Sequence, residues 1–298
     1  MANIGTGELS NSIATIVAAT ALGFLKANTV MSRLVARDWD NEVATHGQTV
    51  DIPFTGALSV NDKAADTAVT LQTPSDSKVS VTLDKHKEVS FLIEDIGRAL
   101  ARPDYLTAYM TDGMAVLAEQ IDTDLTALYS GFSQTIDATT GLAEDDFREA
   151  RRQLNSAKAP LATRYAVLHE DAEFEALAID RVVNRDYTET LGSMAADNFT
   201  GRFMGFDIFM DQKITIATAQ AKNMFFHRNA IVMATRPLPP APANAGVVQS
   251  VMDEDGMGLR ATLSYNPDHL GVQVTIDVLY GVAELRDSHG VVVSTTEI

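Results

Sequence analysis

The chain has 298 residues, of which 46% are apolar and 21% are charged, and these proportions exclude a disordered protein. Cysteine is absent, which excludes disulfides, thiolate metal sites and cysteine nucleophiles and fits a reducing compartment. The formal net charge is −17 and no long basic run occurs, which argues against a protein that grips nucleic acid over its whole surface.

The first 45 residues are predicted to form a helix and an extended arm. Residues 13–25 (IATIVAATALGFL) are too few for a membrane span and lack the basic leader of a signal peptide. Residues 29–40 show no clean period and suggest an extended segment. Helical spacing predicts that one face of the helix at 13–25 packs on the protein, and this face consists of Ile13, Ile16, Val17, Thr20, Ala21 and Phe24.

A two-stranded ribbon is predicted over 49–93. TVDIPF (49–54) alternates in polarity, and Pro53 suggests an edge strand. Residues 56–78 are rich in Gly, Ser, Asn, Asp and Thr and predict a long polar loop. VSVTLDKHKEVSFLIED (79–95) alternates over a length that would span roughly 55 Å as a single strand.

A long helix follows the ribbon. Pro103-Asp104 is a helix start, Gly131 is a stop, and the helix between them is about 40 Å long. Its predicted apolar stripe is Leu106, Met110, Met114, Leu117, Ile121, Leu125 and Leu128. Its predicted polar face is Asp112, Glu119, Asp122 and Asp124.

The remainder mixes short helices with strands, so the predicted fold class is α+β. Helices are expected at 144–157 and 171–183, and strands at 164–169, 201–211 and 223–235. A stiff proline-rich linker (236–246) leads into 247–294, where alternating runs are separated by turns.

No motif points to catalysis, a cofactor or a metal. The turn DEDGMG (253–258) lacks the spacing of a calcium loop, and GTG (5–7) has no strand before it. His169-Glu170-Asp171 fits a strand end and a helix start capped by Asp171. We therefore predict no catalytic, cofactor-binding or metal-binding residue and favour a structural protein. An acidic α+β enzyme with residues far apart in sequence is an open alternative.

Seven phrases carry a resemblance through their order along the chain. They are HGQTVDIPF (46–54), VSFLIED (89–95), LAEQIDTDLTALY (117–129), YAVLHEDAEFEAL (165–177), GRFMGFDIF (201–209), FHRNAIVMA (226–234) and VLYGVAELRDSHGVVV (278–293). In this order they resemble the major capsid (coat) protein of tailed bacteriophages.

The resemblance implies a division of the chain. Residues 1–45 would be the N-terminal arm and 46–95 an extended β-hairpin loop that reaches a neighbouring subunit. Residues 96–135 and 245–298 would form the peripheral domain with its long spine helix. Residues 136–244 would form the mixed axial domain.

The resemblance also implies a function and partners. Many copies would assemble through pentamers and hexamers into an icosahedral shell in the virion, which encloses double-stranded DNA without reading its sequence. Assembly would take place in the bacterial host cytoplasm, without a membrane. Because the arm begins almost at Met1, the resemblance implies a separate scaffolding protein, or none, together with a portal and a possible decoration protein. An encapsulin-like protein compartment is the alternative within the same fold.

In such a shell, a neighbour can cover a ribbon that is marginally stable alone. We expect Val89, Phe91 and Ile93 to pack on the chain's own long helix. The intersubunit contact candidates are Val79, Val81, Leu83, Lys85 and Lys87, with the lysines and His86 facing acidic groups or water at the crossing. The alternative is two ordinary strands within one subunit, joined by a turn at 84–88.

Overall fold

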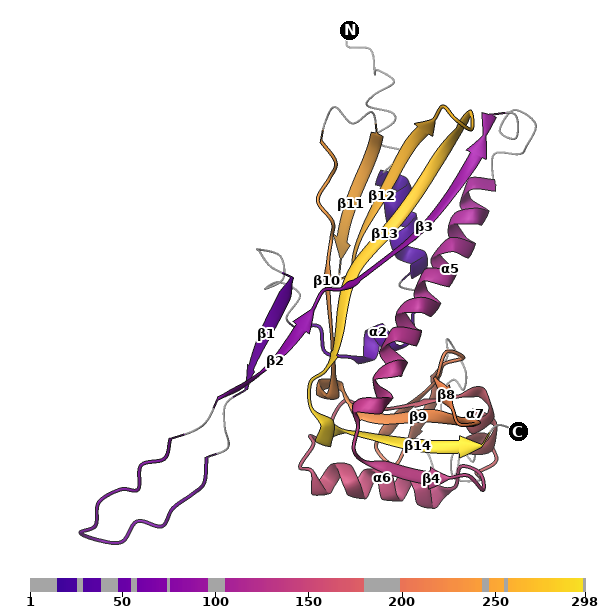
Figure 1. Ribbon diagram of the computed structural model, residues 1–298. Helices are drawn as coiled ribbons and strands as arrows, with labels where there is room; N and C mark the ends of the chain where they lie inside the picture. The colour runs from indigo at the N-terminus through magenta and orange to yellow at the C-terminus, as the bar shows by residue number, and fades with distance from the viewer. Residues whose placement is uncertain are drawn as a thin grey trace.

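Two β-sheets, joined through a long helix, form the body of the molecule (Figure 1). This mixture of helices and strands confirms the predicted α+β class. The computed structural model describes residues 15–25, 29–38, 48–54, 58–73, 76–95, 105–179, 199–242, 247–254 and 257–296. Ile13, Pro103, Asp104 and the GTG of 5–7 lie outside these residues.

The first sheet combines C-terminal strands with one strand of the predicted ribbon. Its antiparallel strands lie in the order β10, β13, β12, β11, and β3 pairs along β13 as well. Most of the alternating segment 247–294 forms strands here, as predicted. The bounds are β3 Lys85–Glu94, β10 Ile231–Arg236, β11 Val247–Glu254, β12 Met257–Asn266 and β13 Gly271–Glu284.

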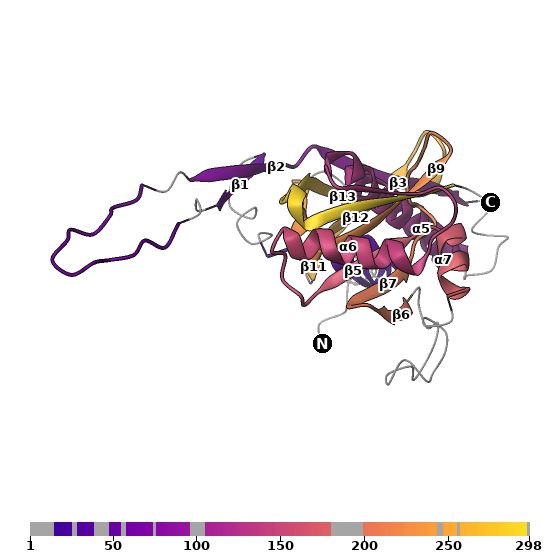
Figure 2. The same cartoon turned by 90° about the horizontal axis from the view of Figure 1, so that it is seen from below.

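The second sheet is mixed, with β4 parallel to β14 and β5 parallel to β7. Its order is β4, β14, β9, β5, β7, β6, and β8 pairs with β9. Figure 2 shows the helix α6 lying across this sheet. The bounds are β4 Thr135–Ala138, α6 Glu144–Ser156, β5 Arg164–Leu168, α7 Glu170–Leu177, β6 Phe199–Phe203, β7 Phe206–Met210, β8 Ile216–Ala217, β9 Gln220–His227 and β14 Gly290–Thr296.

Central strands of the second sheet carry apolar residues on both faces because both faces are covered. Val291 and Val293 of β14 belong to the core beneath α6 and α7, whereas Val292 belongs to the core around the long helix. Phe147 of α6 packs edge-on against Phe225 of β9, with 5.2 Å between the ring centroids. A strand buried on both sides loses the period-2 pattern, which explains runs such as VVV.

The predicted long helix is present as α5 (Tyr105–Thr126), continued by the 3₁₀ turn η1 (Ala127–Gly131). The buried part of its predicted stripe is Met110, Met114, Leu117, Ile121 and Leu125, with Leu128 packed at the edge of the core. The side chain of Leu106 lies outside the described residues.

The first sheet packs on α5 through the residues that the sequence predicted. A Cβ atom at Gly113 would lie 2.9 Å from Val89 Cγ1, so the strand approaches the helix at its smallest residue. The rings of Phe91 and Tyr109 lie 6.0 Å apart. The predicted packing of Val89 and Phe91 on the long helix is confirmed, and Ile93 is half-buried.

The N-terminal helix packs on the core through a face that differs from the predicted one. Residues 15–25 are helical, and Ile16, predicted to face inward, is exposed. The expected extended arm contains the short helix α2 (Met31–Leu34), which joins the same core. The hydroxyl of Thr20 bonds its own helix backbone at Ile16 O, away from the core. The buried face is Val17, Ala18, Ala21, Leu22 and Leu25.

Asp122, predicted on the polar face of the long helix, is instead buried. The two oxygens of its carboxyl group accept hydrogen bonds from the backbone N–H groups of Val30 (2.8 Å) and Met31 (3.1 Å), at the start of α2. Burial, with the nearby Asp211, raises the pKa of Asp122 to about 8. The polarity pattern predicted the wrong environment for Asp122, because this side chain accepts hydrogen bonds at the start of a helix about ninety residues away.

The division between the two sheets differs from the predicted domain boundaries at three strands. β3 lies in the range assigned to the extended loop (46–95), yet it pairs with β13 of the first sheet. β10 lies in the range assigned to the axial part (136–244), yet it pairs with β13 of the first sheet. β14 lies in the range assigned to the peripheral part (245–298), yet it pairs with β4 and β9 of the second sheet. The chain therefore passes between the sheets more often than the linear boundaries imply.

The pKa of Asp122 predicts the pH dependence of stability. The folded chain keeps this proton up to about pH 8, whereas the unfolded chain loses it near the ordinary value of 3.8. The free energy of unfolding therefore falls as the pH rises between these values, by at most about 1.4 kcal/mol per pH unit. Burial lowers the pKa values of His227 and His289, so these groups titrate below pH 6.5.

Urea unfolding of the subunit between pH 6.5 and 8 tests this effect, to which the neighbouring Asp211 adds, because burial raises its pKa as well. We expect Asp122→Asn to flatten the slope and the exposed Asp112→Asn, on the same helix, to keep it. An equal slope in the Asp122 variant would contradict the assignment.

Candidate assembly surface

A β-hairpin projects from the body and ends in a long open loop (Figure 1). β1 (Thr49–Phe54) pairs antiparallel with β2 (Ser77–Thr82) in a sheet of their own. Residues 58–73 continue outward, and the view from below also shows them far from both sheets (Figure 2). The predicted ribbon with a polar tip is therefore present.

The long alternating segment 79–95 is divided at Leu83 and Asp84. β2 pairs with β1, whereas β3 pairs with β13, so the chain changes partner between them. A Cβ atom at Gly281 of β13 would collide with the backbone of Thr82, so the crossing requires glycine there. The alternative interpretation, two strands within one subunit, describes the fold better than one continuous strand. Its turn at 84–88 is wrong, because residues 85–88 already belong to β3.

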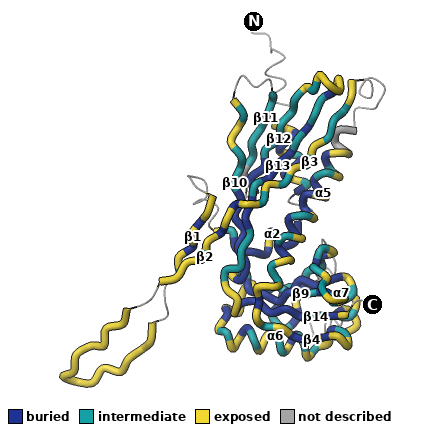
Figure 3. The backbone as a smooth tube through the Cα atoms, viewed as in Figure 1, coloured by how far each residue is buried: buried dark blue, intermediate teal, exposed yellow. Residues whose placement is uncertain are grey.

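The hypothesis that Val81 and Leu83 pack on a neighbour is wrong in this structure, because the chain itself covers them. Both side chains are buried in a cluster with Ile52 of β1 and with Val232 and Ala234 of β10. This cluster anchors the base of the hairpin to the body (Figure 3). Val79 is half-buried and remains a candidate for contact with a neighbour.

Two basic residues at the crossing, Lys85 and His86, face acidic groups of the same chain. Lys85 Nζ lies 3.5 Å from Asp124 Oδ2. His86 Nε2 lies 3.0 Å from Oδ2 of the buried Asp277, which also accepts two hydrogen bonds from Arg260. These pairs fasten β3 within the subunit.

Lys87 differs from Lys85 in having no ion-pair partner among the described residues, and it is half-buried. Of these two lysines, Lys87 is therefore the better candidate for a contact with a neighbouring subunit.

The most exposed apolar residues of the loop were not predicted. Leu58, Val60, Val69 and Leu71 are all exposed; Val60 is 99% exposed and Leu71 is 89% exposed. Figure 3 shows the whole projecting loop in the colour of exposed residues. They alternate with polar residues in ALSVN and AVTLQ, and this period could have indicated them. A row of exposed aliphatic side chains is typical of a surface that another protein covers.

One side chain connects the two limbs of the loop in place of backbone pairing. Gln72 Oε1 accepts from the backbone N–H of Ser59 at 2.8 Å, and Gln72 Nε2 donates to the carbonyl oxygen of Ser59 at 2.5 Å. The amide thus imitates a backbone peptide and holds Val60 and Leu71 in register. The aliphatic side chains of the two limbs are therefore presented together.

Histidine and carboxylate groups form no metal site in the described parts of the chain, where no three of them gather closely enough to hold an ion. His169, not Asp171 as predicted, caps α7, because its ring accepts from the Asp171 backbone N–H. His227 and His289 pack edge to face at 5.7 Å, and burial lowers the pKa of His227 to about 4. Among the described helices, none is long and apolar enough to cross a membrane.

Comparison with known proteins gives similarity in three dimensions only. No family model matches the chain, and no curated protein matches it in sequence. A structure from Mycobacterium phage Che8 has a TM-score of 0.66 and 19% identity, over 89% of this chain and 90% of that chain. The capsid of the cyanophage P-SCSP1u has a TM-score of 0.64 and 14% identity, over 91% and 89%.

The capsid of Ralstonia phage GP4 has a TM-score of 0.63 and 10% identity, over 89% of this chain and 87% of that chain. At such low identity the comparison establishes the fold and not the activity. The expected phage capsid fold is thereby confirmed over almost the whole chain.

The buried cluster at the hairpin base predicts the effect of two charged substitutions. Val81→Asp places an unpaired charge in this cluster and should lower the free energy of unfolding by about 3–5 kcal/mol. Thr82→Asp, at an exposed position on the same strand, should change it by no more than about 0.5 kcal/mol. Urea unfolding of the unassembled subunit measures both. If Val81→Asp were as stable as Thr82→Asp, the cluster would not be holding the hairpin.

Proposed function

We propose that this chain is the major capsid subunit of a tailed bacteriophage. Many copies form an icosahedral shell that encloses double-stranded DNA. The observation that carries the proposal is the projecting loop with its exposed aliphatic side chains, in a chain whose fold is that of phage capsids. The subunit acts by binding to copies of itself, and no catalytic step is involved.

The loop needs a partner for a physical reason. Its described residues, 58–73, are exposed throughout and contribute nothing to the three buried cores. Ordering a segment costs about 1–2 kcal/mol per residue in backbone entropy, and only burial of apolar surface can offset that cost. A neighbouring subunit that covers Leu58, Val60, Val69 and Leu71 supplies this burial.

Contact between the loop of one subunit and the body of the next is heterologous, because the two surfaces differ. Such contacts close into rings when the rotation between subunits allows it, which suits pentamers and hexamers. Each subunit then both gives and receives a loop. Modest contacts combine over many copies into a stable shell.

The parts of the subunit take their expected roles with adjusted limits. Residues 1–45 act as the N-terminal arm, and the part of 46–95 that precedes β3 acts as the extended loop. The first sheet with α5 acts as the peripheral domain, which receives β10. The second sheet with α6 and α7 acts as the axial domain, which receives β14.

The partners follow from this role. A separate scaffolding protein, a portal and a possible decoration protein complete the particle, which is assembled in the bacterial host cytoplasm. The net charge of −17 suits a container that must not adhere to the DNA inside it. Nucleic acid in purified particles supports the capsid role, whereas a protein cargo would support an encapsulin-like compartment instead.

Serine substitutions in the loop separate folding from assembly. We expect the quadruple variant Leu58→Ser, Val60→Ser, Val69→Ser and Leu71→Ser to keep the melting temperature of the subunit, because these side chains are exposed. Each buried aliphatic contact contributes about 1.5–3 kcal/mol, so its yield of closed particles should fall by at least about tenfold.

The control is Asn61→Ser with Thr70→Ser, polar positions of the same two limbs, which should assemble normally. Sedimentation velocity and electron microscopy measure the particles. Closed shells at wild-type yield from the quadruple variant would show that these side chains do not contribute to assembly. A wild-type chain that never assembles would refute the capsid role itself.

A further inference from the structure

Two buried histidines lie where the chain crosses from one sheet to the other. His227 ends β9 and precedes the 3₁₀ turn η3 (Arg228–Ala230), which leads into β10 of the first sheet. His289 ends the 3₁₀ turn η4 (Asp287–His289), through which β13 of the first sheet continues into β14 of the second. Figure 1 shows β13 running into β14 below the first sheet.

The two crossings are joined to each other as well as to their sheets. The rings of His227 and His289 pack edge to face, with 5.7 Å between their centroids, and the residues are only 4% and 7% exposed. The carbonyl oxygen of Ala230 accepts hydrogen bonds from the backbone N–H groups of Leu285 (2.7 Å) and Arg286 (3.2 Å), just before η4. A change at either ring therefore affects both crossings.

The hydrogen bonds of His227 require a neutral ring. Its Nδ1 accepts from the backbone N–H of Asn229 at 3.1 Å, so this nitrogen carries no proton. Its Nε2, 3.1 Å from Thr163 Oγ1, then carries the single ring hydrogen and donates it. A second proton would place an N–H on Nδ1 opposite the N–H of Asn229, and the cap of η3 would be lost.

Thr163 has a strained backbone at the same crossing. Its φ is 52°, in the left-handed region that a β-branched residue rarely adopts. Besides the bond to His227, its carbonyl oxygen accepts from the backbone N–H of Arg228 at 3.1 Å. Such a conformation persists only while the surrounding contacts hold it, and it is typical of segments that switch. Protonation of His227 disturbs one of these contacts.

The permanent charges beside the two rings are positive. Arg164 of β5 pairs with His227 of β9 and is itself buried, and Arg228 and Arg286 flank the rings along the chain. Burial, together with these arginines, lowers the pKa of both histidines, that of His227 to about 4. A proton added to either ring therefore meets like charges in a place from which water is excluded.

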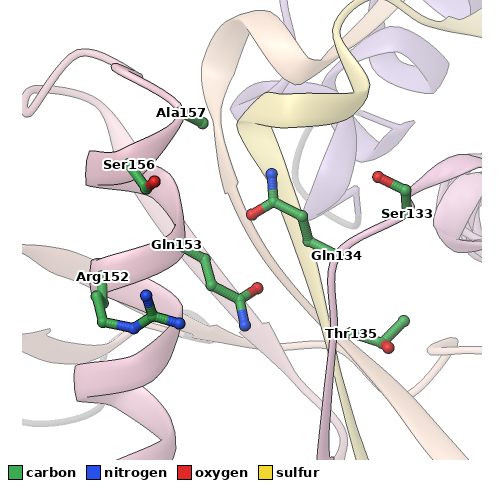
Figure 4. A pocket seen from close by; sticks show the side chains of 7 residues that line it. All are labelled: Ser133, Gln134, Thr135, Arg152, Gln153, Ser156 and Ala157. Carbon is green, nitrogen blue, oxygen red and sulfur yellow. The ribbon is translucent and has the colours of Figure 1, made fainter.

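The carboxyl groups near the crossings are engaged elsewhere. Asp287 accepts hydrogen bonds from the backbone N–H (2.6 Å) and the hydroxyl (2.7 Å) of Ser133, which Figure 4 shows on the segment that enters β4. Asp38 pairs with Arg228 at 3.4 Å. Burial raises the pKa of Glu284, at the end of β13, which favours its neutral form. Neither histidine ring of the pair has a carboxylate partner among the described residues.

We propose that the His227–His289 pair is an acid-sensitive latch between the two sheets, closed while both rings are neutral and opened by proton binding. Opening hydrates the rings, which then bind protons near the ordinary pKa of 6.5 and not at the lower pKa values of the closed state. Acid therefore favours the open state, by up to about tenfold per pH unit for each histidine below pH 6.5. The latch belongs to the single subunit and does not depend on the proposed capsid function.

Hydrogen exchange of the unassembled subunit at pH 7.5 and pH 5 tests the latch. The measured quantity is the protection factor, which compares each amide with an unstructured peptide at the same pH. We expect the amides of Asn229, Leu285 and Arg286 to lose protection by at least about tenfold at pH 5, whereas the amides of β12 keep theirs. Equal protection of the three amides at both pH values would overturn the proposal.

A double variant without these titratable rings separates the latch from other effects of pH. His227→Asn keeps a side-chain oxygen that can cap η3, and His289→Phe keeps an aromatic ring in the pair. We expect this double variant to keep its protection at pH 5, and the control His269→Asn, at an exposed turn, to lose it as the wild type does. A loss in the double variant equal to that of the wild type would assign the effect to other groups.

Titration of the wild-type rings makes the test independent of how the variants fold. Nuclear magnetic resonance of the ring C–H groups gives the pKa of each histidine in the folded subunit. We expect His227 and His289 to titrate at lower pH than the exposed His269. A pKa near 6.5 for His227 would show that its ring is already open to water at neutral pH, and the latch would be refuted.

Discussion

The structure depends on the burial of one helix by three different parts of the chain. The apolar stripe of α5 lies in a single core to which the first sheet, the inner face of the second sheet and the N-terminal segment all contribute. A helix surrounded in this way must bury a polar group that would otherwise face water, and Asp122 is that group. The oxygens of its carboxyl group accept hydrogen bonds from the backbone at the start of α2, which offsets the cost of burying this group. The same hydrogen bonds link the N-terminal segment to α5.

The hairpin follows from the same core. Because β13 extends beyond the part that β12 pairs, its far half is free to pair with β10 and to pass beneath the crossing at Leu83. The apolar base of the hairpin then closes against β10, which fixes its root on the body. Because the base of the loop is fixed on the body, presenting Val60 and Leu71 to another molecule costs less conformational entropy than it would from a free hairpin.

The sequence by itself determined which side chains are apolar and with what local period. The stripe from Met110 to Leu125, the inward face of α6 and the packing of Val89 and Phe91 on the long helix all follow from spacing, because backbone geometry repeats every 3.6 or 2 residues. The α+β class was readable for the same reason, whereas the capsid fold was indicated by a resemblance of seven phrases in order.

Only the tertiary structure decided what covers each face. Val81 and Leu83 alternate with polar residues, as expected for a ribbon with one uncovered face, yet β10 covers them. This contact joins residues about 150 positions apart. Leu58 and Val60 have a similar period and are covered by nothing in the described chain. The burial of Asp122 arises from contacts between distant segments. A local period cannot encode such contacts, because it specifies the direction of a side chain and not its partner.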